Sequence, residues 1–155
     1  MLNRGMKAGL LQAKPYLVRE EGERFQSLGV LVSVKASTEQ TGGGFNLFDV
    51  ICPIDFATPL HIHYAEDVAV FVIEGAIKCF WGDEKERAGI GSLFFQPRGT
   101  PHGFRVEGDG PARILYMTVP AGFDQLVLQG VSSTRNLKVT TVARHKIEIL
   151  GPLPE

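Results

Sequence analysis

The sequence has little of what marks secreted, membrane-spanning or nucleic-acid-binding proteins. Two cysteines in 155 residues, with no Cys-x-x-Cys pair, argue against a disulfide framework and favour reduced thiols in the cytoplasm. The longest apolar run, residues 68–73, is far shorter than the ~20 residues that cross a bilayer. Sixteen Lys and Arg oppose seventeen Asp and Glu, without the basic excess of a nucleic-acid binder. We therefore expect a cytoplasmic protein with neither a membrane nor a nucleic-acid partner.

The residues that are present favour a compact chain of short strands. Hydrophobic residues make up 44% and charged residues 21%, the profile of a folded globular protein, and the length is that of one ordinary domain. Eighteen glycines and nine prolines recur at short intervals, which favours many short strands over long helices. We therefore expect one domain built mainly from β-strands.

Eight segments rich in Val, Ile, Phe and Leu predict the strands: 29–34, 45–52, 61–63, 68–73, 76–81, 92–96, 103–107 and 112–119. The mixed-charge segment 83–87 is interpreted as a solvated hairpin arm, and short helices are predicted only near the carboxyl end, at 122–129 and 136–146. The fold class is therefore all-β with short C-terminal helical segments. A small closed barrel or jelly roll suits it, because closure removes exposed sheet edges.

Three of the four histidines lie where they invite chemistry. His61 and His63 are two positions apart in a predicted strand, so both imidazoles project from one sheet face, and His102 follows the Pro- and Gly-rich turn 97–101. Three imidazoles converging from two strands would make an open site for zinc, copper, iron or nickel. The alternative for an isolated His-x-His is a pair of unrelated surface or hydrogen-bonded histidines.

The residues around these histidines form two longer patterns. Residues 61–75 are HIHYAEDVAVFVIEG and residues 91–102 are GSLFFQPRGTPH. They resemble the two signature motifs of the cupin superfamily, HxH-x(3,4)-E-x(6)-G and G-x(5)-P-x-G-x(2)-H-x(3)-N. Residues 41–123 are similar to the quercetin 2,3-dioxygenase-like branch of small single-domain bacterial cupins.

The resemblance implies a double-stranded β-helix, the cupin jelly-roll barrel, as a single domain over residues 1–155. Its barrel core would span about 41–123, followed by a carboxyl-terminal tail at 124–155. The resemblance further implies one divalent metal ion (Fe, Ni, Mn or Zn) held by His61, His63 and His102. Small cupins usually pair, so we expect a homodimer, to which the segment 15–34 could contribute a strand.

One departure from the motifs bears on mechanism. Val68 stands where the superfamily usually carries a metal-binding glutamate. Asp67, next to it on a strand, would point to the opposite face, and Glu66 lies in the preceding turn and could reach back only if that turn were distorted. Three neutral ligands leave the charge of a divalent ion uncancelled, which favours an anionic ligand. Valine also cannot take a proton from a substrate as a carboxylate base would.

Three functions follow from these residues. The first is a dioxygenase that cleaves a small anionic phenolic or diketone compound. The second is a non-catalytic protein that binds or senses a small, anionic or aromatic molecule and has a degenerate metal site. The third is a metal-assisted isomerase or hydrolase. The expected pocket residues are Val68, Val70, Phe104 and Arg98, for which ordinary core packing or, for the arginine, an exposed turn is the alternative.

Overall fold

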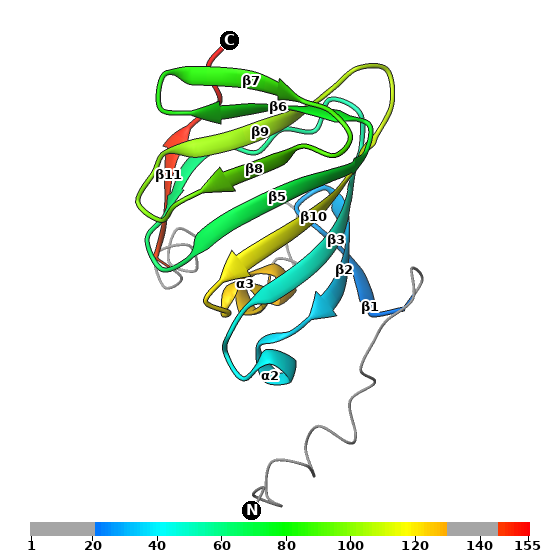
Figure 1. Cartoon of the computed structure of the whole chain (residues 1–155), viewed down its shortest axis with the longest axis vertical. Coiled ribbons are helices and arrows are strands. Elements are labelled where there is room, and N and C mark those ends of the chain that lie inside the picture. The colour runs from blue at the N-terminus through cyan, green and yellow to red at the C-terminus, as the bar shows by residue number, and fades with distance from the viewer. Residues whose placement is uncertain (1–20, 130–145) are drawn as a thin grey trace, which may run out of the picture.

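The computed structural model describes residues 21–129 and 146–155, which form two antiparallel sheets packed face to face (Figure 1). The six-stranded sheet has the order β1-β2-β3-β10-β5-β8. Its strands are β1 (Glu23–Ser27), β2 (Val30–Ala36), β3 (Asn46–Cys52), β10 (Ala112–Val119), β5 (Asp67–Glu74) and β8 (Leu93–Gln96).

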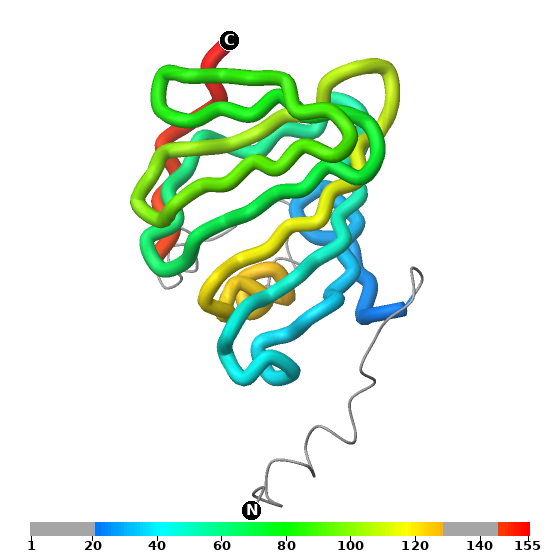
Figure 2. Tube along the Cα trace, in the orientation of Figure 1, coloured from blue at the N-terminus to red at the C-terminus, as the bar shows by residue number. Residues whose placement is uncertain are grey.

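The second sheet has five strands in the order β11-β4-β9-β6-β7. Its strands are β11 (Ile147–Gly151), β4 (Leu60–His63), β9 (His102–Glu107), β6 (Ala76–Trp81) and β7 (Glu84–Ala88). In the tube of Figure 2, β11 near the carboxyl end lies beside β4, with which it pairs although more than 80 residues separate them along the chain. Two short helices complete the described elements, α2 (Thr38–Thr41) and α3 (Phe123–Gln129).

The strand predictions hold, and the structure adds two strands to them. Each of the eight predicted segments coincides with a strand to within two residues at either end. β1 and β11 were not predicted, and the charged arm at 83–87 is largely β7, which pairs with β6 and is exposed along most of its length. The helix predicted at 122–129 is α3, whereas the one predicted at 136–146 lies almost wholly outside the described residues. The two sheets thus extend beyond the predicted core of 41–123.

The amino-terminal strands belong to the chain's own sheet. β2 pairs with β3, and β1 pairs with β2 as the edge strand of the six-stranded sheet. The part of the segment 15–34 that the structure describes is therefore already paired on one side, and only the outer edge of β1 is open to a neighbour.

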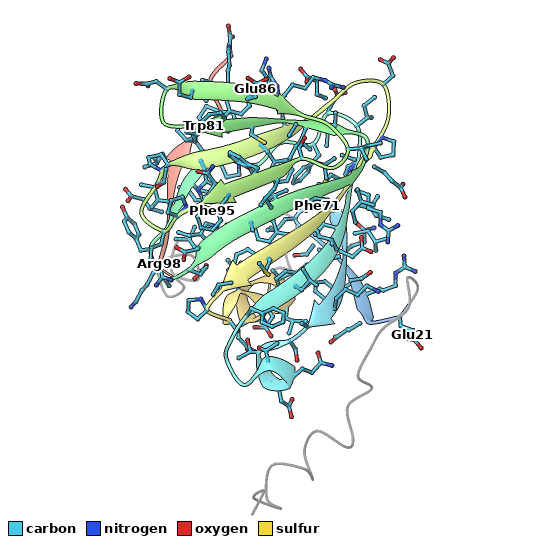
Figure 3. All side chains as sticks on the ribbon, viewed as in Figure 1. Glu21, Phe71, Trp81, Glu86, Phe95 and Arg98 are labelled. Atoms are coloured by element: carbon cyan, nitrogen blue, oxygen red, sulfur yellow. The ribbon has the colours of Figure 1, made fainter. Side chains whose placement is uncertain are left out.

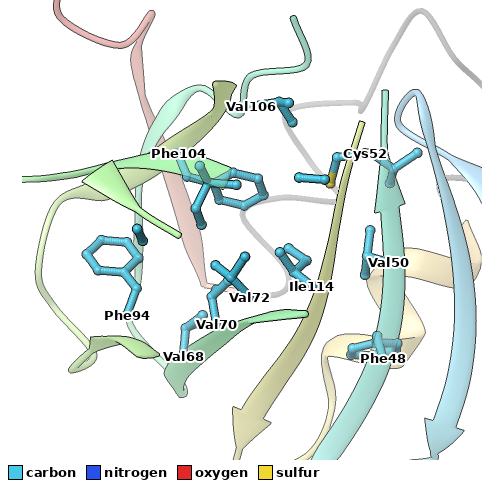
Figure 4. Packing of buried hydrophobic residues seen from close by; sticks show 14 of the residues in the cluster. Phe48, Val50, Cys52, Val68, Val70, Val72, Phe94, Phe104, Val106 and Ile114 are labelled. Carbon is cyan, nitrogen blue, oxygen red and sulfur yellow. The ribbon is translucent and has the colours of Figure 1, made fainter. Parts of the chain in front are cut away.

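Alternation along the strands places the core between the sheets. In β5, Val68, Val70 and Val72 point inward and are buried, while Phe71 points outward and is exposed. Figure 4 shows the three valines on the same inner face of the sheet as Ile114 of the adjacent strand β10, where Val72 and Ile114 are register partners. β-branched side chains pack well on a pleated surface, which is why this run forms a central strand.

Both cysteines belong to this core, as expected of small apolar side chains. Cys52 and Cys79 are free and buried, and burial raises the pKa of each thiol to about 12. Neither thiol ionises near neutral pH, so neither serves as a nucleophile.

Helix α3 is fixed against the end of the barrel by buried polar side chains. The Asp124 carboxylate accepts hydrogen bonds from the Thr38 backbone N–H at 2.8 Å and from its hydroxyl at 2.6 Å. The Asn46 side-chain oxygen accepts from the backbone N–H groups of Gly122, at 2.9 Å, and of Asp124, at 3.2 Å. These contacts set where the helix presents its apolar side chains. Within residues 21–129 and 146–155, no helix has the length and apolar character needed to span a bilayer.

Candidate metal centre

Strand pairing brings the three predicted histidines together. His61 and His63 lie on β4, His102 begins β9, and His61 and His102 are direct partners across the β4–β9 pair. Their ring centroids are 4.5 to 5.4 Å apart, and one nitrogen from each lies within 4.8 Å of the others.

The turn within the second motif, just before β9, locks this arrangement. Gly99 has a φ of +79°, a conformation that favours glycine, and its backbone N–H donates to the carbonyl of His63 at 2.7 Å. This hydrogen bond ties the turn before β9 to the end of β4. The spacing between Gly99 and His102 in the second motif therefore positions the His102 imidazole next to those of His61 and His63.

Each imidazole is oriented by an acceptor at its outer nitrogen. Nδ1 of His61 lies 2.8 Å from the Pro59 carbonyl, and Nδ1 of His102 lies 2.9 Å from the Thr100 carbonyl. Nδ1 of His63 lies 2.6 Å from a Glu66 carboxylate oxygen. Because all three partners are acceptors, a proton on each Nδ1 satisfies them, and this tautomer leaves each Nε2 able to present a lone pair to a metal ion.

Two of the Nε2 atoms lie close together, and the third is buried beside them. Nε2 of His61 is 3.1 Å from Nε2 of His63, so two lone pairs face each other unless a proton or metal ion lies between them. Nε2 of His102 is buried and has no hydrogen-bond partner among the described residues. Burial, reinforced by the neighbouring imidazoles, lowers the pKa of His61 to about 3, and burial lowers that of His102 to about 4. The donor set therefore fits a divalent transition metal, which binds neutral imidazole.

Glu66 takes a role that the sequence did not reveal. It is buried, and the turn after β4 directs its carboxylate to the outer nitrogen of His63. A carboxylate in this position orients a metal-binding imidazole and makes it a stronger donor. The sequence did contain a signal for this role, a glutamate three residues after a histidine. Strand register alone gave no reason to choose Glu66, because it lies in a turn between two strands.

Tyr116 is a second residue that sequence reasoning missed. It lies on β10 with its ring packed against Phe123 of α3, and its hydroxyl is 3.4 Å from Nε2 of His63. Burial raises the pKa of this phenol, and the negative charge of Glu66 raises it further, so Tyr116 stays protonated. A neutral hydroxyl thus stands next to the three nitrogens. Its only sequence signal was the alternation of β10, which places it inward together with Ile114.

The histidines and Tyr116 open into an apolar cavity of about 170 Å³. Val68, Val70 and Phe104, three of the four residues predicted for the pocket, line it. At this volume the cavity is close to the ~150 Å³ that holds a benzene ring, so one ring or a short acyl chain fits inside. Apart from the histidines, its wall is mostly Val, Phe, Leu and Ile, which suits a ligand that is apolar except at one end.

Arg98 lies elsewhere. Its guanidinium donates to the Asp67 carboxylate, at 3.1 and 3.3 Å, and this pair is on the outer surface (Figure 3). The Arg98 backbone N–H also donates to Asp67, at 2.9 Å, and the arginine does not line the cavity. The placement of Asp67 is the one expected from strand alternation, since it faces away from Val68. Arg98 was predicted to be a pocket residue, and its position does not match that prediction. The turn that carries Arg98 directs its side chain outward, where it pairs with Asp67.

Two facing sheets around an inward-facing histidine cluster define a β-barrel with a candidate metal site. Over residues 50–118 the chain matches the family of the cupin domain, and the fold of the described residues is that of solved cupin barrels.

Comparisons with individual proteins agree with this assignment. Over 103 residues the chain is 28% identical to a quercetin 2,3-dioxygenase of Bacillus subtilis, a match that covers 66% of this chain and 31% of the other. The chain therefore spans about a third of the length of that relative. The structure of KdgF from Halomonas sp. aligns with a TM-score of 0.64 at 19% identity, over 73% of this chain and 99% of the other. The polyketide cyclase RemF from Streptomyces resistomycificus aligns with a TM-score of 0.53 at 26% identity, over 71% and 75%.

Proposed function

We propose that this cupin is a metal-dependent enzyme that binds a small enolisable diketone or phenol as its anion and cleaves it with dioxygen. The observation that carries the proposal is the convergence of three neutral Nε2 lone pairs, each held in place from behind by an acceptor at Nδ1. A divalent metal ion bound there would polarise the ligand oxygens and leave positions free for substrate and dioxygen.

The missing carboxylate at Val68 shapes the choice of substrate. No acidic side chain from the described residues lines the cavity, so the ligand end of the site has no negative charge of its own. The one nearby carboxylate, Glu66, already accepts from His63 and so serves to hold that imidazole. The site therefore favours a ligand that brings its own negative charge, as an enolate or phenolate does.

Tyr116 is suited to orient such an anion. Its hydroxyl stays protonated and points at the nitrogen cluster, where it can donate to a ligand oxygen once the lone pair of His63 is engaged elsewhere. The apolar wall formed by Val68, Val70 and Phe104 then holds the ring or chain of the ligand and excludes water from it.

The two more similar relatives support this substrate class. One is named a quercetin 2,3-dioxygenase and the other a polyketide cyclase. Phenols and polyketides share oxygen atoms that readily form phenolate or enolate anions. In the proposed reaction a carbon–carbon bond of the anion breaks and both atoms of dioxygen are incorporated, into two fragments from an acyclic diketone or into one ring-opened product from a catechol, so no further electron donor is required.

A redox-neutral conversion of the same substrate class is the second candidate. Tyr116 favours it, because a protonated hydroxyl beside the ligand site can donate a proton as a general acid without any oxidant. Isomerisation or ring closure of an enolate would need only such a transfer.

Oxygen consumption separates the candidates. The purified chain would be loaded in turn with Fe(II), Ni(II), Mn(II) or Zn(II), its metal content measured by mass spectrometry, and oxygen uptake followed with pentane-2,4-dione and with catechol. Uptake equal to substrate loss, with at least one metal, supports the dioxygenase. Substrate loss without oxygen, with zinc bound, supports the redox-neutral enzyme instead. Tight binding without turnover in any form would contradict both and leave a binding protein.

A further inference from the structure

The hairpin between β1 and β2 ends in an unusual residue. Ser27 and Val30 are paired, so Leu28 and Gly29 form a two-residue loop, and their φ angles are +54° and +86°. Both residues thus take the left-handed conformation required by the hairpin turn called type I′. Asn-Gly or Gly-Gly is the usual choice there, because a large side chain in this conformation strains the backbone.

Packing in the core does not account for the leucine. Leu28 is 39% exposed, and it belongs neither to the buried core nor to the partly buried residues that pack against it. An asparagine or glycine would form the same turn with less strain. The leucine is therefore explained neither by the conformation of the turn nor by burial in the core.

Leu28 lines the cavity that the histidines share. Most of the apolar wall is deeply buried, as Val70 and Ile114 are, whereas Leu28 and Ile149 line the cavity and remain exposed. Residues that both line a cavity and reach solvent mark its mouth. The hairpin is also held there, because the Ser27 hydroxyl donates to the Val127 carbonyl of α3 at 3.1 Å in a buried contact.

We propose that Leu28 is a specificity-determining residue, kept in a strained conformation because its side chain closes the mouth of the pocket over the apolar part of a ligand. The ligand class rests on the proposed function: a phenolate or enolate whose oxygens face the histidines and whose alkyl substituent reaches the mouth. The contact with the substituent does not itself require a metal ion.

The test uses three substitutions in the full chain, Leu28→Ala, Leu28→Gly and Leu28→Asn, with Leu128→Ala as the matched control. Leu128 is 37% exposed, lies on α3 and does not line the cavity. Binding to zinc-loaded protein is measured by calorimetry with catechol and with 4-tert-butylcatechol. Each Leu28 variant is expected to bind 4-tert-butylcatechol about 10-fold more weakly than the unmodified chain, with catechol changed less than about 2-fold, since only the substituent loses apolar contact.

A second arm separates this proposal from the proposed function. Metal-free protein is titrated with tert-butylbenzene, which has no oxygen to bind a metal, and Leu28→Ala is expected to weaken this binding about 10-fold as well. If catechols do not bind but tert-butylbenzene does, with the loss at Leu28, the proposed function fails and the role of Leu28 stands. If tert-butylbenzene does not bind the unmodified chain, or if Leu128→Ala costs as much as Leu28→Ala, the role of Leu28 is overturned.

Thermal unfolding tests the strain itself. Leu28→Ala and Leu28→Gly both remove the side chain, but only alanine keeps a Cβ in the left-handed conformation. We expect Leu28→Gly to melt roughly 2–4 °C above Leu28→Ala, the reverse of the order at ordinary positions. Equal melting temperatures, or alanine above glycine, would show that the turn is not strained and would remove this part of the argument.

Discussion

The five-stranded and six-stranded sheets face the same cavity and contribute different chemistry to it. All three histidines come from the five-stranded sheet, on β4 and β9. The six-stranded sheet supplies Val68, Val70 and Ile114, with the Tyr116 hydroxyl as the polar group that contacts the cluster. The five-stranded sheet thus supplies the groups suited to bind a cation, together with the apolar Phe104, whereas the six-stranded sheet supplies no such group and mainly apolar side chains, and this difference generates the predictions below.

The largest effect is expected from the histidine wall. Replacing His63 with alanine removes a ligand and leaves Glu66 buried without its partner, so we expect the affinity for Zn(II) to fall more than about 100-fold. The affinity is measured by competition with a chromophoric chelator. Val68→Ala, on the facing wall, is the control and should change it less than about 3-fold. Equal losses of Zn(II) affinity in the two variants would show that metal binding does not depend specifically on the histidines of the five-stranded sheet.

Glu66→Ala should have the next largest effect. Removing the carboxylate frees the His63 ring to rotate and weakens it as a donor, which typically costs 10- to 100-fold in metal affinity. Asp67→Asn is the matched control, because the adjacent carboxylate pairs with Arg98 on the outer surface. The same chelator competition applies. A loss in Asp67→Asn as large as in Glu66→Ala would mean that Glu66 acts through the fold and not through His63.

Val68→Glu sharpens the comparison by placing a charge on the apolar wall. In metal-free protein a buried carboxylate without a partner should destabilise the fold by about 2 kcal/mol, seen in urea unfolding. Bound Zn(II) should recover that loss, because the new carboxylate faces the cavity that the histidines share. Val72→Glu, inward-facing but outside the cavity lining, is the control that metal should not rescue. If Zn(II) restored the stability of both variants equally, the conclusion that Val68 faces the histidines and Val72 does not would be contradicted.

The smallest effect, per histidine and per pH unit, concerns the metal-free protein in mild acid. The pKa of His61 is lowered to about 3 and that of His102 to about 4, against ~6.5 in the unfolded chain. Below pH 6.5 the unfolded chain therefore takes up protons that the folded chain does not, and stability falls as the pH falls. The loss should approach about 1.4 kcal/mol per pH unit for each histidine down to its folded pKa.

Urea unfolding of metal-free protein at pH 7.5, 6.5, 5.5 and 4.5 measures this slope. A double variant, His61→Asn and His102→Asn, should lose most of it because asparagine does not titrate. Parallel curves for the two proteins would show that other groups cause the acid sensitivity.

Strand positions and the candidate ligands were predictable because they depend on local patterns. Alternating apolar residues fixed β5 and β10 to within a residue, and His-x-His placed two imidazoles on one face of β4. The two strands that escaped prediction give a weaker signal: β1 has one apolar residue among five, and β11 is a five-residue segment that follows a predicted helix. Both exist because a neighbouring strand offers them hydrogen-bond partners.

The sequence by itself determined the all-β fold, the spacing of His61, His63 and His102, and the absence of a carboxylate at Val68, because each depends on residue type and short-range periodicity. Only the tertiary structure decided that His102 lies beside His61, that Glu66 turns back to His63, and that Tyr116 faces the cluster while Arg98 faces away. These outcomes depend on sheet pairing between distant segments and, for Glu66 and Arg98, on the conformations of the turns that carry them. No local pattern encodes them, since the free energy that selects them comes from packing the two sheets together.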